Sequence, residues 1–203
     1  MDLTYENIKD KIIYALYDDD CPGAKPRKCF GHQDKDTGLI KGYHILLKCD
    51  DKDCATIPIT PEMCDDYNYN VKTIMEDAER NMQMLLPKNI VNIGPMFMLT
   101  NEKCFFGASG IFYDDILSEL EEKIGGDYYV IPSSKHEVMI TETGSFTPCE
   151  IYEMLEGGNR DYCDETELLS YKVFMYDAGR GKLCVVYDNG EVQNTLVDES
   201  EEQ

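Results

Sequence analysis

The chain has 203 residues, of which 40 are Asp or Glu and 19 are Lys or Arg, so its formal net charge at pH 7 is −21. Such an acidic chain repels nucleic acid and anionic membrane surfaces, which excludes direct binding to either and favours cations or basic proteins as partners. Hydrophobic residues make up 42% of the sequence, which excludes wholesale disorder.

The amino-terminal part predicts one helix and one strand pair. Apolar side chains of residues 3–17 recur on one helical face, which predicts a helix. Residues 42–48 alternate between apolar and polar side chains, and residues 56–59 are apolar and β-branched, so both are expected in a sheet.

The middle of the chain predicts a long helix followed by a hairpin. The apolar stripe of residues 71–86 predicts a helix that ends before Pro87. Two apolar runs, 96–99 and 104–113, are separated by the turn-forming residues 100–103, which predicts a β-hairpin.

A second helix and two strands follow the predicted hairpin. Residues 114–124 place their apolar side chains on one helical face, and the glycine pair 125–126 is expected to cap the end of this helix. Residues 128–131 and 138–140 are expected as strands, and they flank the polar loop Pro132–Glu137.

The carboxyl-terminal part predicts a short helix and a hairpin. Residues 151–155 are expected to form a helix that ends at the glycine pair 157–158. Residues 171–176 and 182–187 are expected to pair across a glycine-containing turn.

The order of these elements predicts the fold class and the domain organisation. We expect an α+β fold with a mainly antiparallel sheet and helices packed on it. Residues 1–197 form one such domain, in which residues 1–41 are either part of the domain or a helical or loop appendage. Residues 198–203, with four acids in six residues, are expected to be an acidic tail.

Four strings of residues suggest a known family. They are PMFMLTN, FFGASGIFY, GGDYYVIPSSKHEVMI and ETELLSYKVFMYD. With these strings the sequence resembles, over roughly residues 45–186, the bacterial domain-of-unknown-function family numbered 5688. The resemblance implies no activity, because none is established for that family. Lys135 stands where the family pattern has an apolar residue, and the amino-terminal part is shorter than usual.

One candidate catalytic site is the loop Ser133-Ser134-Lys135-His136-Glu137. A serine, an imidazole and a carboxylate are the groups that nucleophilic hydrolysis needs, provided that they lie within hydrogen-bond reach of one another. A small hydrolase-like enzyme centred on this loop is therefore one hypothesis. The alternative is a structural turn whose hydroxyl groups bind loop amides.

Cysteine and histidine residues suggest a weak candidate metal site. Cys29, His32, Cys49 and Cys54 offer four soft ligands, but their spacing only partly matches that of zinc sites. We therefore expect no metal and no cofactor. The number of cysteines, nine, is odd, and the first residues do not resemble a signal peptide, so we expect mainly reduced thiols and a cytoplasmic location.

The acidity itself supports the main functional hypothesis. Carboxylates on a rigid surface can imitate the phosphates that a basic groove binds. We therefore expect a non-enzymatic protein that binds, and thereby inhibits, a basic protein such as a nuclease, another nucleic-acid-binding protein or a toxin, in an anti-defence, immunity or nucleic-acid-mimic role. The residues expected to contact this partner are Glu76, Asp77, Glu79, Asp114, Asp115, Glu119, Glu121 and Glu122.

Overall fold

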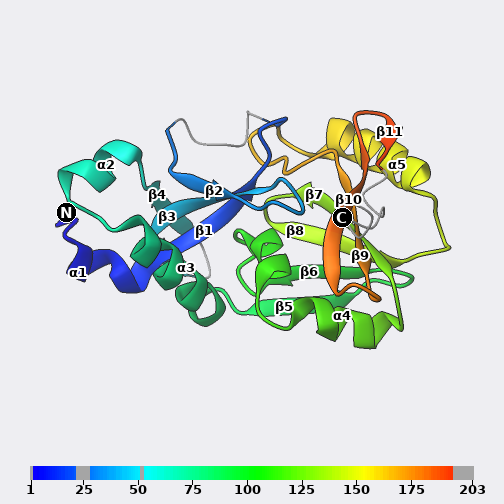
Figure 1. Ribbon diagram of the computed structural model, residues 1–203, viewed down its shortest axis with the longest axis horizontal. Coiled ribbons are helices and arrows are strands. Elements are labelled where there is room, and N and C mark those ends of the chain that lie inside the picture. The colour runs from blue at the N-terminus through cyan, green and yellow to red at the C-terminus, as the bar shows by residue number, and fades with distance from the viewer. Residues whose placement is uncertain (1, 22–27, 51–52, 194–203) are drawn as a thin grey trace, which may run out of the picture.

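The computed structural model describes residues 2–21, 28–50 and 53–193, so the predicted acidic tail at 198–203 lies outside the described residues. The predicted α+β class is confirmed, with two antiparallel sheets rather than one. Figure 1 shows the four-stranded sheet with α1, α2 and α3 in one half of the molecule, and the seven-stranded sheet with α4 and α5 in the other half. No helix within the described residues is long and apolar enough to cross a membrane.

The smaller sheet is built around its third strand. β3 pairs along one edge with β1, and along its other edge with β2 and then β4. The elements of this half are α1 (Tyr5–Ile8), η1 (Lys9–Lys11), β1 (Ile12–Tyr17), β2 (Gly31–Gln33), β3 (Ile40–Cys49), β4 (Cys54–Pro58), α2 (Pro61–Asp66) and α3 (Val71–Leu85).

The prediction of a helix over residues 3–17 is wrong for its second half. Residues 12–17 form β1, and all six of these residues are buried. A strand that is covered on both faces has a continuous apolar sequence, which periodicity alone does not distinguish from a buried helix. These residues belong to the main hydrophobic core, together with α3 and with residues of the larger sheet.

The larger sheet has the strand order β11-β10-β9-β7-β8-β6-β5, and every neighbouring pair is antiparallel. Its elements are β5 (Lys88–Asn92), β6 (Phe97–Asn101), η2 (Gly107–Phe112), α4 (Ile116–Ile124), β7 (Tyr128–Ser134), β8 (Glu137–Glu142), α5 (Pro148–Tyr162), β9 (Val173–Asp177), β10 (Lys182–Asp188) and β11 (Glu191–Val192).

The predicted hairpin of residues 96–99 and 104–113 is wrong. β6 pairs instead with β5, and residues 107–112 form the 3-10 helix η2. Gly107 explains the difference, because a Cβ atom at this position would clash with the carbonyl oxygen of His136 and with Thr100. The backbone of η2 therefore packs closer to the sheet than a strand with side chains could.

Helices cover both faces of the larger sheet. Tyr128 and Val130 of β7 lie in the main core with Leu120 of α4. Tyr129 and Ile131, which alternate with them, lie in a second cluster that contains residues of α5. Since successive strand residues point to opposite faces, α4 and α5 pack on opposite sides of the sheet.

Helix α5 is three times as long as predicted. The side chain of Thr147 accepts a hydrogen bond from the Glu150 N–H, and the Glu150 carboxylate accepts one from the Thr147 N–H, which is a capping box. The glycine pair 157–158 does not end the helix, because each glycine costs only about 1 kcal/mol in a helix interior and packing of the preceding turns compensates for it. The other predicted helices and the terminal hairpin are confirmed.

A buried ion pair joins the end of β1 to the segment before β9. The Asp18 carboxylate, 1% exposed, accepts hydrogen bonds from the Ser170 hydroxyl at 2.5 Å and from the Lys172 ammonium at 2.9 Å. The same ammonium lies 2.9 Å from Asp20. Asp18 and Asp20 therefore connect the two halves of the fold.

We expect Lys172→Met to lower the free energy of unfolding by about 3 kcal/mol, because it leaves the Asp18 carboxylate buried without its cation. Urea denaturation at pH 7 measures this loss. The control is Lys123→Met, because the Lys123 side chain is 43% exposed on α4 and its ion pair contributes less than about 1 kcal/mol. Equal losses in the two variants would contradict the prediction.

Candidate functional site

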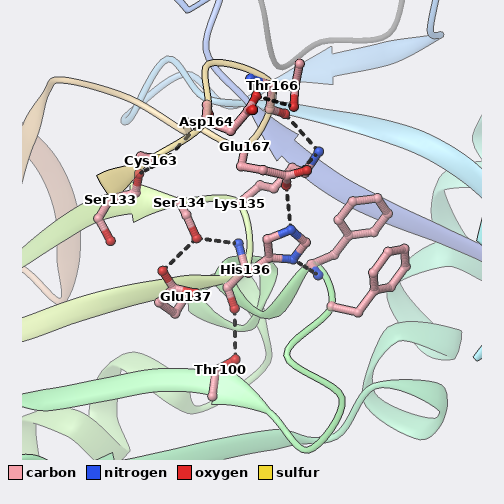
Figure 2. A network of polar contacts seen from close by, with 12 residues as sticks. Thr100, Ser133, Ser134, Lys135, His136, Glu137, Cys163, Asp164, Thr166 and Glu167 are labelled. Carbon is pink, nitrogen blue, oxygen red and sulfur yellow. Dashed lines mark hydrogen bonds and ion pairs between the residues drawn. The ribbon is translucent and has the colours of Figure 1, made fainter. Parts of the chain in front are cut away.

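The predicted loop spans the end of β7, the turn at Lys135 and His136, and the start of β8, but its side chains do not bond as a catalytic triad. The Ser134 hydroxyl donates to the Glu137 carboxylate at 2.7 Å and accepts from the main-chain N–H of His136 at 3.0 Å. Figure 2 shows these contacts, with the imidazole of His136 turned away from them. Within the described residues, no hydrogen bond joins the imidazole to Ser133 or Ser134.

Both nitrogen atoms of the His136 ring are engaged. Nδ1 accepts a hydrogen bond from the main-chain N–H of Phe106 at 3.2 Å, so the ring proton is on Nε2. Nε2 lies 2.5 Å from the carboxylate of Glu167 and donates to it. An imidazole held in this way has no lone pair left to take a proton from a serine, and it acts as a link between loops.

Glu167 is the residue of this network that the sequence analysis missed. Its carboxylate also lies 3.0 Å from the Lys135 ammonium, and its carbonyl oxygen accepts a hydrogen bond from the main-chain N–H of Lys135. The sequence offered one signal, because Glu167 lies in the family-like string ETELLSYKVFMYD. Its pairing with His136 could not be predicted, since the two residues are 31 positions apart.

A cleft of about 650 Å³ lies between α5 and the β7–β8 hairpin, and we call it the α5 cleft. Its floor is apolar and contains Met96, Ile131, Met139, Ile151, Met154 and Leu155. Its polar lining includes Ser133, Ser134, His136, Glu137, Asn159, Cys163, Asp164 and Glu167. The volume and the mixture of an apolar floor with a few polar groups are typical of ligand sites.

The α5 cleft is negatively charged. Glu137, Asp164 and Glu167 contribute carboxylates, of which Glu167 is paired with Lys135, and no Lys or Arg is among the described residues that line the cleft. Hydrogen bonds from the side chain and main chain of Thr166 lower the pKa of Asp164, so that this group is ionised at neutral pH. Burial, together with the neighbouring carboxylates, raises the pKa of the Cys163 thiol, which is therefore a poor nucleophile.

A smaller cavity of about 320 Å³ shares His136 and Glu167 with the α5 cleft. It also contains Tyr17 and His44 of the smaller sheet. The His44 ring is hydrogen-bonded through Nε2 to the Tyr17 hydroxyl at 2.8 Å and through Nδ1 to the Thr56 hydroxyl at 3.2 Å. Burial, and to a smaller extent the positive charge of Lys135, lowers the pKa of His44 to about 4.

The four candidate metal ligands do not converge. Cys49 and Cys54 are partners across the β3–β4 hairpin and form a disulfide bond, which corrects the expectation of reduced thiols at these two positions. His32 is exposed on β2, and Cys29 is buried beside Tyr43. No group of three metal-binding side chains comes together in the described part of the chain.

The acids predicted to contact a partner divide into two groups. Glu76, Asp114, Asp115 and Glu122 are exposed, although Glu76 pairs with Lys72 and Asp114 accepts a hydrogen bond from Gln83 at the surface. The other four make contacts within the protein: Asp77 is buried and bonded to Tyr5 and Arg80, Glu79 pairs with Lys41, Glu119 pairs with Lys88, and Glu121 accepts from the Tyr176 hydroxyl.

Comparison with known proteins confirms the resemblance seen in the sequence over a shorter stretch. Residues 89–178 match the model of a family of unknown function, DUF5688. This segment contains the β7–β8 turn, Glu167 and helix α5. No curated protein and no solved structure matches the chain.

We expect the His136 ring of the wild-type protein to be in the Nε2–H form, which long-range ¹H–¹⁵N correlation spectra identify. Glu167→Gln retains an acceptor oxygen for this proton and should keep the same form. Glu167→Ala removes the acceptor and should lower the free energy of unfolding by about 1 to 2 kcal/mol. An Nδ1–H form in the wild type would contradict the bonding described here.

The low pKa of His44 predicts a pH dependence of stability. An unfolded histidine has a pKa near 6.5, so between about pH 6.5 and pH 4 the unfolded chain binds a proton that the folded protein excludes. His44 therefore makes stability fall as the pH decreases through this range. Between pH 7 and pH 4, we expect the free energy of unfolding of His44→Gln to fall by roughly 2 to 3 kcal/mol less than that of the wild type. Urea denaturation at the two pH values measures both changes. If the free energy of unfolding changed with pH in the same way in the wild type and in His44→Gln, the prediction would be wrong.

Proposed function

We propose that the protein acts by binding a basic protein, and that the α5 cleft receives part of this partner. The observation behind the proposal is the composition of the cleft, with three carboxylates, an apolar floor and no Lys or Arg among its described lining residues. A cationic partner with exposed apolar side chains complements both features.

Charge and apolar contact have separate roles in this binding. The net charge of −21 attracts a basic protein over a distance and accelerates association at low ionic strength. Burial of apolar surface against the cleft floor then slows dissociation, at roughly 25 cal/mol per Å² removed from water. The exposed acids Glu76, Asp114, Asp115 and Glu122 would contribute to the attraction.

Binding is better supported than catalysis by the geometry of the loop. A hydrolase centred on Ser133, Ser134, His136 and Glu137 needs an imidazole that accepts a proton from a serine. Here the ring is bonded to Phe106 and Glu167, and the Ser134 hydroxyl donates to Glu137. Docking at the cleft would cover the basic site of the partner and thereby inhibit it. Such inhibition is consistent with an anti-defence, immunity or nucleic-acid-mimic role.

Two neighbouring glycines of α5 provide a matched test. Gly158 lines the cleft and Gly157 is not among its lining residues, while a Cβ atom at either position would meet no atom within 4 Å apart from its chain neighbours and the backbone of its own helix. Leu at either position raises helix stability relative to Gly, by about 0.5 to 1 kcal/mol. Gly158→Leu therefore fills the cleft without endangering the fold, and Gly157→Leu is its control.

We expect tagged wild-type protein and Gly157→Leu to retain the same basic protein from a host-cell lysate at low salt and to release it at high salt. Gly158→Leu should retain at least about fivefold less, because its new side chain occupies the docking space. Quantitative mass spectrometry measures the three captures in parallel. The proposal fails if the retained proteins are not basic, or if Gly158→Leu retains them as well as its control does.

A further inference from the structure

Asn159 is a buried polar residue in the α5 cleft. Its side chain is 5% exposed and lines the cleft, and its Nδ2 atom has no hydrogen-bond partner within the described part of the protein. A buried donor that is unpaired loses its bonds to water and gains nothing in return. Such a group is rare in folded proteins and needs an explanation.

The helix around Asn159 favours an apolar residue at this position. Ile151, Leu155 and Asn159 are spaced by four residues, so they lie on one face of α5. Ile151 and Leu155 are buried in the core cluster beneath this face, and a leucine at 159 would extend their apolar stripe. Packing alone therefore does not account for the asparagine.

Among the described residues, no acceptor that lines the cleft is hydrogen-bonded to the Asn159 Nδ2 atom. Glu137 accepts from Ser134, Asp164 accepts from Thr166, and Glu167 accepts from His136. The Asn159 amide is thus a donor held in place for an acceptor that comes from outside the protein.

We propose that the occupant of the α5 cleft is an extended peptide segment of the basic partner, and that Asn159 donates a hydrogen bond to one of its main-chain carbonyl oxygens. An apolar side chain of the segment lies on the floor, where Met96, Met139 and Met154 adapt to its shape. A neighbouring Lys or Arg of the segment reaches the carboxylates of Asp164 and Glu137. This inference rests on the proposed function and adds the chemical class of the ligand.

Three small probes separate the contributions of charge, apolar surface and carbonyl groups. The first is acetyl-Leu-Leu-Lys-amide, which is apolar and basic and has main-chain carbonyl groups. The second is acetyl-Leu-Leu-Glu-amide, which differs only in the sign of its charge. The third is octylamine, a cation with an apolar chain and no carbonyl group. Chemical-shift titration of the ¹⁵N-labelled full chain measures the dissociation constant of each probe.

We expect Asn159→Leu to raise the dissociation constant of the Lys peptide roughly fivefold, which is the usual effect of losing one neutral hydrogen bond. The dissociation constant of octylamine should not change. The same variant should melt at a higher temperature than the wild type, because it removes an unpaired buried donor. Asn159→Asp is the second variant. If charge alone governed binding, the added carboxylate would raise the affinity for the Lys peptide. If the amide donor is needed, its loss in this variant lowers the affinity.

The outcomes distinguish this inference from the proposed function. Asn159 has no such role if Asn159→Leu lowers the affinities for the Lys peptide and for octylamine equally, or lowers neither. The same conclusion follows if Asn159→Asp raises the affinity for the Lys peptide. A cleft that binds octylamine but not the Lys peptide at millimolar concentration accepts a cationic amphiphile, which overturns the peptide assignment. Equal affinity of the wild type for the Lys and Glu peptides overturns the proposed function itself.

Discussion

The shape of the α5 cleft depends on the carboxylate of Glu167. This one group accepts a hydrogen bond from His136 and forms an ion pair with Lys135, and the carbonyl oxygen of Glu167 accepts a hydrogen bond from the main-chain N–H of Lys135. These contacts hold the β7–β8 turn against the segment that follows α5 (Figure 2). Because Phe106 fixes the other side of the His136 ring, the turn is held from both sides and its polar groups have fixed positions.

The polar groups around the cleft divide into satisfied and unsatisfied ones. The serine, the imidazole and the carboxylates of the rim form hydrogen bonds within the protein, which makes them a rigid frame. The amide nitrogen of Asn159 is the lining atom that is both buried and without such a bond among the described residues, and Gly158 beside it leaves the helix backbone open to the cleft. Leucine in place of Asn159 would favour the free folded protein, so this residue lowers stability where a ligand would dock.

Local patterns predicted the elements that depend on local chemistry. The apolar stripes of α3 and α4, the left-handed glycine after α4 and the strands around the β7–β8 turn were all recognisable in the sequence. Predictions were wrong where tertiary packing decides the structure. The buried strand β1 resembled a helix, and residues 104–113 resembled a strand, because neither pattern shows what covers the segment.

The sequence by itself determined the strong negative charge, the α+β class, and the presence of a Ser-Ser-Lys-His-Glu turn, since charge, periodicity and turn residues are properties of neighbouring positions. Only the tertiary structure decided what the turn does. The bond between His136 and Glu167, the position of Asn159 in the lining of the cleft and the disulfide between Cys49 and Cys54 depend on which groups meet in space. A hydrogen bond requires its two atoms to be about 3 Å apart, and no spacing along the chain specifies that distance for residues of separate elements.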